Sequence, residues 1–165
     1  MLIGLAAITI HSRLKLQLGI PGHQGLIFIG LIMAGRLSSG KATAASLSCL
    51  TASALSFLPF WGFQNIFFPI TFLIPGLLID FILNSINYKK GKNIFFTFIL
   101  FISLTGGLAY MTIPLTRLLI TLITGLPFGA FAKYGYFIPI ASHFIFGFVG
   151  AFIVSLAFVK RKNKL

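Results

Sequence analysis

Very few side chains in this sequence could carry out acid–base, nucleophilic or metal chemistry. Asp80 is the only acid among 165 residues, so catalysis by paired carboxylates lacks its second partner. Cys49 is the only cysteine and lies among small apolar residues, which favours core packing. His11, His23 and His143 lack the spacing of metal ligands and have no acid or thiol beside them. We therefore expect no enzyme activity, no metal site and no cofactor.

The overall composition is typical of a membrane protein. Hydrophobic residues make up 58% of the chain, charged residues make up 8%, and the mean hydropathy is +1.03. Soluble domains carry about 25% charged residues, which they need to cover their surface. A net charge of +12 could suggest a nucleic-acid partner, but nucleic-acid-binding proteins also have polar surfaces. We therefore expect residues 1–165 to form a single domain in the lipid bilayer, with no nucleic-acid partner.

Seven apolar runs predict an all-α, polytopic membrane protein. The runs cover residues 2–10, 18–35, 42–60, 66–83, 94–111, 113–130 and 136–159. A helix needs about 20 residues to cross the hydrocarbon core, so the first run is short for a crossing. The separators between the runs are short and carry most of the charge.

The charges of these separators set the expected topology. By the positive-inside rule, the basic segments around Arg36, around Lys89 and from Lys160 onward lie in the cytoplasm. These assignments agree only if one of the last three runs does not cross. Residues 113–130 contain Pro114 and further helix-breaking residues, which predicts a broken or re-entrant segment there, or an extension of the fifth helix. The expected fold is a six-helix transmembrane bundle, multi-pass in the cell membrane, with both termini in the cytoplasm.

Sparse polar residues near the expected outer end could form a binding site. Arg117 could bind an anionic group through two parallel hydrogen bonds, or it could snorkel to the membrane interface. The external loop at residues 18–25, just before a helix begins, carries an imidazole and an amide, and could close over a ligand or cap the helix. His143 lies on the small-residue face of the last run, where it could contact a ligand or an interhelical carbonyl. The residues that we expect to bind substrate are His23, Gln24, Asn65, Arg117 and His143.

Small residues predict where helices approach one another or a partner protein. Within 42–60 they recur at every fourth position, which permits close helix contact in lipid. Asp80, near the expected inner end, is costly in lipid unless it pairs with a base such as Arg36 or Lys41. The residues that we expect to dock a partner are Gly30, Ala34, Ala44, Ser48, Ala52 and Asp80. The Phe-rich stretches, which include Phe72, are expected to face lipid.

The sequence resembles the small substrate-binding (S) components of energy-coupling factor (ECF) transporters, which capture vitamins and related micronutrients in prokaryotes. The resemblance lies in the chain's size, the six-crossing scheme, residues 20–25 leading into 31–36, and residues 68–80. It implies a membrane-embedded protein that binds a small-molecule nutrient and associates with a transmembrane coupling protein and two ATPase subunits. The sequence itself has no P-loop for ATP hydrolysis. The alanine repeat expected in the family's first helix is absent.

A second function from a different class is also compatible with the sequence. A chain of this composition could be a scaffold or accessory subunit of another membrane complex, with no ligand of its own. Co-purified partners and ligands distinguish the two hypotheses.

Overall fold

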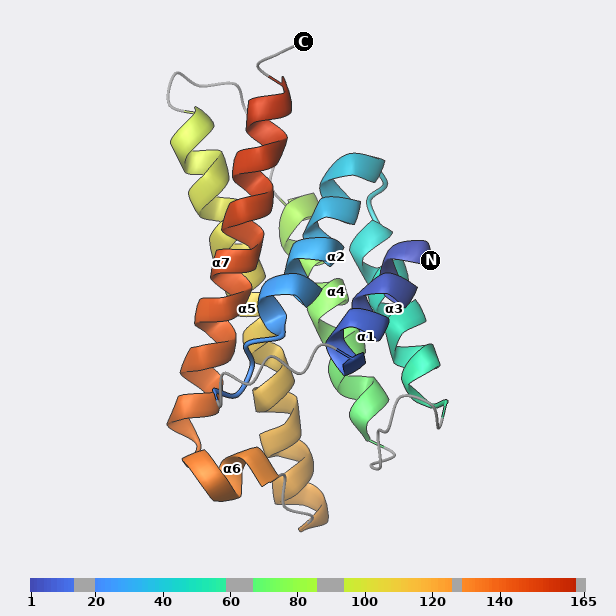
Figure 1. Cartoon of the computed structure of the whole chain (residues 1–165), viewed down its shortest axis with the longest axis vertical. Helices are drawn as coiled ribbons and strands as arrows, with labels where there is room; N and C mark the ends of the chain where they lie inside the picture. The colour runs from blue at the N-terminus through green and yellow to red at the C-terminus, as the bar shows by residue number, and fades with distance from the viewer. Residues whose placement is uncertain (14–19, 59–66, 86–93, 126–128, 163–165) are drawn as a thin grey trace.

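All the regular elements in the described part of the chain are α-helices, as the sequence predicts. The computed structural model describes residues 1–13, 20–58, 67–85, 94–125 and 129–162. The helices are α1 Leu2–Arg13, α2 Gly25–Ser39, α3 Ala44–Ser56, α4 Phe68–Ser85, α5 Ile94–Thr124, α6 Gly129–Tyr134 and α7 Phe137–Lys162 (Figure 1). Six of them match the apolar runs, and α6 is a single short helix between α5 and α7.

The six longer helices alternate in direction along the long axis of the molecule (Figure 1). The two longest, α5 and α7, lie side by side, and α2 packs against α7. On the other side, α3 packs against α4, and α1 lies against both α2 and α3. The C-terminal ends of α2, α4 and α7 therefore lie at one end of the bundle, and the C-terminal end of α5 lies at the other.

The segment that was expected to be broken continues the fifth helix. α5 runs without interruption through Pro114 and Arg117 to Thr124. A proline inside a helix removes one backbone N–H, so the carbonyl of the residue one turn earlier loses its helical hydrogen bond. The helix ends only at Gly125, whose φ of 71° is in the left-handed region that glycine adopts easily. For residues 113–124 the extension is confirmed; the regular helix stops at the predicted breaker Gly125, residues 126–128 lie outside the described residues, and α6 begins at Gly129.

Several hydroxyl groups along α5 donate hydrogen bonds within the helix itself. Ser103, Thr105 and Thr116 each donate a hydrogen bond to the carbonyl oxygen four residues earlier, at distances between 2.7 and 2.9 Å. Such local bonds let Ser and Thr lie inside an apolar helix without an unsatisfied donor.

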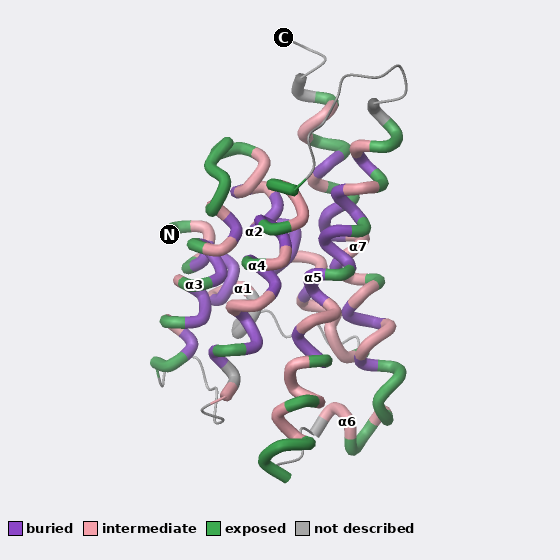
Figure 2. The backbone as a smooth tube through the Cα atoms, turned by 180° about the vertical axis from the view of Figure 1, so that it is seen from behind, coloured by how far each residue is buried: buried purple, intermediate pink, exposed green. Residues whose placement is uncertain are grey.

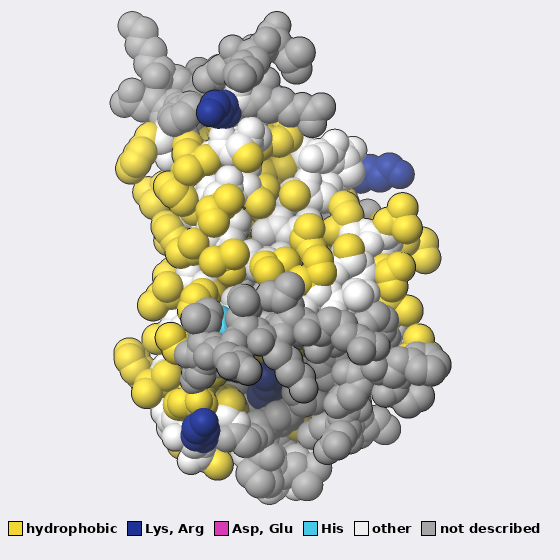
Figure 3. All heavy atoms as spheres, in the orientation of Figure 1, with side chains coloured by type: hydrophobic (Ala, Val, Ile, Leu, Met, Phe, Trp, Pro, Cys, Tyr) yellow, Lys and Arg dark blue, Asp and Glu magenta, His cyan; other side chains and the backbone are white. Residues whose placement is uncertain are grey.

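Two helical segments are long and apolar enough to cross a membrane by length and composition, namely Phe96–Thr124 and Phe137–Lys160. The apolar helices Gly25–Ser39, Ala44–Ser56 and Pro69–Ser85 are shorter. Apolar side chains cover much of the described surface on the face shown in Figure 3. Phe96, for example, is 72% exposed. A surface of this kind is unfavourable in water and suits an apolar environment.

The buried residues lie where the helices face one another (Figure 2). Phe72 is fully buried and packs on Phe28, with ring centroids 5.5 Å apart. The expectation that Phe72 faces lipid is therefore wrong, because α4 turns this ring toward α2. Hydropathy could not distinguish the two sides of α4, since almost every residue of that helix is apolar.

Glycines allow α5 and α7 to touch backbone to backbone. A Cβ added at Gly147 would lie 2.6 Å from the carbonyl oxygen of Gly106 and 2.6 Å from the Cβ of Tyr110. A Cβ added at Gly150 would collide with the backbone of Leu26 on α2. Small residues on α7 therefore bring three helices into direct contact. The same face of α7 carries His143, as the four-residue spacing predicts.

Candidate functional site

The turn before α2 lies directly on a stacked pair of side chains from α5 and α7. The ring of His143 stacks on the ring of Tyr110, with 4.7 Å between centroids and 26° between planes, and both residues are buried. A Cβ added at Gly22 would lie 2.5 Å from Nδ1 of His143, and a Cβ added at Gly25 would collide with the Tyr110 ring. Gly22 also has a φ of 82°. Glycine at both positions is what allows the turn to come this close.

Two histidines of this region each bind a backbone carbonyl through Nδ1. Nδ1 of His143 lies 2.6 Å from the oxygen of Pro139, and Nδ1 of His23 lies 2.7 Å from the oxygen of Ile20. Because a carbonyl oxygen only accepts, Nδ1 carries a proton in both rings. The Nε2 atom of His23 is buried and has no hydrogen-bond partner among the described residues.

Arg117 lies two helical turns after Tyr110 on α5, and therefore on the same face of that helix. Its guanidinium group is close enough to interact electrostatically with both Tyr110 and His143. The side chain is half-buried overall, and its Nε atom is fully buried. A charged group at this depth in an apolar bundle is costly and is a common mark of a functional site.

The structure brings part of the predicted substrate site together. Arg117 lies within electrostatic range of His143, and the turn that carries His23 and Gln24 lies over the Tyr110–His143 stack. Gln24 occupies the N-cap position of α2. Asn65 lies outside the described residues, as does the side chain of His11. No cluster of three or more His, Cys, Asp or Glu residues that could hold a metal ion occurs in the described part of the chain.

The sequence analysis missed Tyr110 and the two glycines of the turn. Tyr110 stands in a long apolar run, where a tyrosine is normally a core residue. The available signal was its spacing of two helical turns from Arg117, which puts both side chains on one face. Gly22 and Gly25 look like ordinary turn residues in the sequence, because only the fold reveals the rings beneath them.

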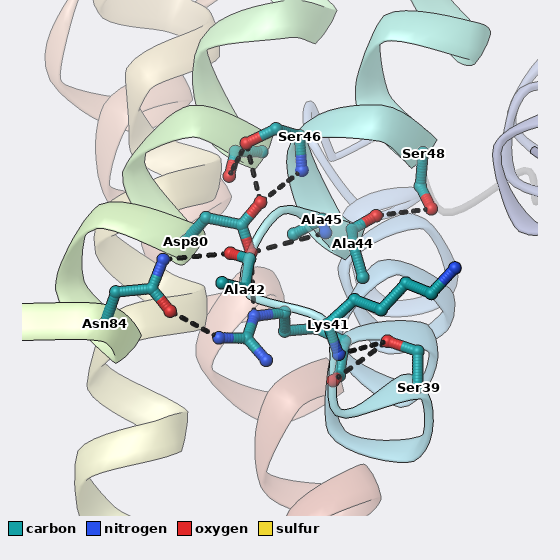
Figure 4. A network of polar contacts seen from close by, with 11 residues as sticks. Ser39, Lys41, Ala42, Ala44, Ala45, Ser46, Ser48, Asp80 and Asn84 are labelled. Carbon is teal, nitrogen blue, oxygen red and sulfur yellow. Dashed lines mark hydrogen bonds and ion pairs between the residues drawn. The ribbon is translucent and has the colours of Figure 1, made fainter.

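A second polar cluster surrounds Asp80 at the opposite end of the bundle (Figure 4). Its Oδ1 atom lies 2.7 Å from Nε of Arg36, and the two side chains form an ion pair. The Nε–H group of Arg36 does not meet the geometry of a hydrogen bond to this oxygen. Its Oδ2 atom accepts hydrogen bonds from the backbone N–H of Ser46 at 2.7 Å and from the Ser46 hydroxyl at 2.6 Å. The predicted pairing of Asp80 with a nearby base is confirmed, and the base is Arg36.

This cluster connects three helices. Asp80 on α4 caps the first turn of α3, whose N–H groups have no partners within the helix. Asn84, one turn further along α4, accepts a hydrogen bond from Nη2 of Arg36 at 2.7 Å and donates one to the carbonyl oxygen of Ala42 at 2.9 Å. All these contacts lie within the chain, so the cluster acts as a structural support for α2, α3 and α4.

The residues predicted to dock a partner lie mostly inside the bundle. Gly30, Ser48, Ala52 and Asp80 are buried, and Ala34 and Ala44 are half-buried. Ser48 faces Gly4 of α1, where an added Cβ would collide with the Ser48 carbonyl. The small residues of α3 therefore serve contacts between helices of this chain. A docking role for any of them stays a prediction.

Comparisons with known proteins assign no family to this arrangement of residues. No family matches the chain, and neither a characterised protein nor a solved structure matches it. Its function has therefore to be inferred from its own residues.

Proposed function

We propose that this chain is the membrane-embedded substrate-capture subunit of an ECF-type importer for a vitamin or similar small nutrient. In this proposal the six longer helices cross the membrane of a prokaryotic cell, with both termini in the cytoplasm. A transmembrane coupling protein and two separate ATPase subunits supply the energy for import.

One observation carries the proposal: Gly22 and Gly25 hold the turn before α2 on the Tyr110–His143 stack, beside Arg117. Three segments that are distant in the sequence thus converge near a half-buried cation and a buried imidazole. A charged side chain within an apolar bundle is a functional-site hypothesis by default, because its burial has to be compensated. A turn lying across such a group is suited to cover a ligand.

Two exposed lysines support membrane insertion with this topology. Lys41 and Lys160 are exposed at the end of the bundle where α2 and α7 finish. Under the positive-inside rule this end faces the cytoplasm. The end that carries the C-terminus of α5 and Arg117 then faces outward, where a nutrient arrives.

Mass spectrometry of the released ligand tests the proposal. The protein is purified from cells in mild detergent and denatured, and the released small molecules are identified. We expect one water-soluble compound in near-stoichiometric amount from the unmodified protein, and a large loss of it from Arg117→Gln. Lys133→Gln is the matched control, since Lys133 is an exposed basic residue on α6 near the same end.

The partners that co-purify decide between the two functional hypotheses. Capture of ATPase subunits together with a bound compound supports an importer subunit. Stable partners with neither ATPases nor a ligand would instead identify a scaffold or accessory subunit.

A further inference from the structure

We infer that the C-terminal end of α7 binds an anionic phospholipid, with the headgroup phosphate at Lys160 and an acyl chain along the exposed helix face that precedes it. The inference rests on the membrane insertion that the proposed function includes, and it is independent of nutrient capture.

The first step concerns the exposed face of α7. Ile145, Ile153 and Leu156 are exposed apolar side chains on this helix. Lys160 is also exposed, and it follows Leu156 by four residues and Ile153 by seven, which places all three on one face. Ser155, on the other side of the helix, is fully buried. We call Ile145, Ile153 and Leu156 the α7 stripe; a cation ends this stripe.

The second step concerns the length of the stripe. From Ile145 to Lys160 the helix rises by about 22 Å, at about 1.5 Å per residue. One leaflet of a bilayer, with its headgroups, is about 20–22 Å thick. The α7 stripe and its lysine therefore match the length of one phospholipid molecule, with the lysine at the level of the headgroup.

The third step concerns the charge at this end of the helix. Lys160 is the first of four basic residues within five positions of the sequence, the others being Arg161, Lys162 and Lys164. The only acidic side chain of the sequence, Asp80, is paired with Arg36. The negative end of the α7 dipole is worth about half a charge and offsets only part of the basic run. No further side-chain carboxylate exists in the chain to balance this charge.

The fourth step concerns the kind of ligand that fits both features. A free phosphate or an acidic soluble protein would use the charge but not the α7 stripe. A lipid without net charge would use the stripe but not the charge. An anionic phospholipid uses both, and basic clusters beside a membrane helix attract such lipids.

The test measures lipid binding to the purified protein in mild detergent, by the anisotropy of fluorescently labelled lipids. Phosphatidylglycerol and phosphatidylcholine with the same acyl chains are compared. We expect phosphatidylglycerol to bind at least tenfold more tightly, since each Lys or Arg near the phosphate contributes about fivefold. Salt should weaken this preference by screening. Equal binding of the two lipids would overturn the inference, and would leave the basic run with a role in orientation only.

A matched pair of variants locates the site. Lys160→Gln should weaken binding of phosphatidylglycerol about fivefold and leave binding of phosphatidylcholine unchanged. Lys133→Gln removes an exposed lysine at the opposite end of the bundle and should change neither. Both side chains are exposed, so neither change disturbs the packing. Equal losses in the two variants would show a general effect of charge and overturn the site.

Competition distinguishes the lipid from other sources of negative charge. Glycerol 3-phosphate, which carries the phosphate without acyl chains, should not displace the labelled lipid even in large excess. Displacement would show an anion site without contact to the α7 stripe and would overturn the inference. Retention of an acidic protein through Lys160, with no preference between the lipids, would identify a protein-docking surface instead.

Failure of the inference and failure of the proposed function give different results. A protein that releases no nutrient but prefers phosphatidylglycerol loses the capture function and keeps the lipid site. A protein that releases a nutrient and binds both lipids equally keeps the capture function and loses the lipid site. A protein that stays in solution without detergent contradicts membrane insertion, and with it both.

Discussion

Oδ1 of Asp80 lies 2.7 Å from Nε of Arg36, and the two side chains are only 6% and 12% exposed. The same carboxylate caps the first turn of α3 through Ser46. One side chain of α4 thus binds both the end of α2 and the start of α3. Loss of its charge would disturb two helix junctions at once.

Asp80→Asn should destabilise the protein by about 3 kcal/mol, because removal of one member of a buried pair leaves the other charge uncompensated. The change keeps the size of the side chain, so packing is little affected. The measurement is the midpoint of unfolding in detergent. The double variant with Arg36→Gln should be no less stable than Asp80→Asn alone, since the uncompensated charge is then gone. An unchanged midpoint for Asp80→Asn would show that the pair contributes nothing to stability.

Gly25→Ala should destabilise the turn, because the new methyl group would collide with the ring of Tyr110. Overpacking of this kind costs about 1–3 kcal/mol. Gly30→Ala on the same helix is the matched control, since its nearest neighbour, the carbonyl oxygen of Gly150, would be at 3.6 Å. Alanine there should be neutral, or stabilising by up to about 1 kcal/mol through helix propensity. Equal thermal midpoints for the two variants would contradict the close packing of the turn.

Gly22→Ala should cost more stability than Gly40→Ala. Both glycines have positive φ, 82° and 64°, so each substitution strains the backbone by about 1–2 kcal/mol. A Cβ at Gly40 meets nothing within 4 Å, whereas a Cβ at Gly22 lies 2.5 Å from His143. The difference between the two unfolding free energies therefore isolates the contact with His143. If both variants lose the same amount, the turn does not press on that ring.

Cysteine labelling tests the proposed topology. Lys41→Cys and Lys160→Cys should react with a membrane-impermeant thiol reagent only when the cytoplasmic side is open to it. Lys133→Cys should react from outside in intact cells, since α6 lies at the other end of the bundle. The native Cys49 is fully buried and should give little background. Labelling of positions 41 and 133 from the same side would contradict the proposed topology, in which the two ends of the bundle face opposite sides of the membrane.

The helices were largely predictable from the sequence because their apolar runs are long and their separators carry charge. Pro114 was the exception, since a proline shows where a helical hydrogen bond is lost but not whether the segment stays helical beside its neighbours. Here α5 continues beside α7, and the long contact between them is a property of the fold. The direction of the Phe72 ring was unpredictable for a similar reason, because no polar face marks the outside of α4.

The candidate site was predictable only in part. A single acid near several bases made the pairing of Asp80 predictable, although the choice of Arg36 over Lys41 needed the structure. Arg117 and His143 were recognisable as polar residues in apolar runs. Their proximity depends on how α5 and α7 align, and periodicity within one helix carries no information on that alignment. The small residues of α3 illustrate the same limit, because a repeat identifies a face but not its neighbour.

The contact between Gly106 and Gly147 also bears on how a bound compound could leave. Where α5 and α7 touch backbone to backbone, not even a methyl group fits between them. Under the proposed function, a nutrient beside Tyr110 would have no passage along this seam toward the opposite end of the bundle. Its release into the cell would have to follow another route than the contact between α5 and α7.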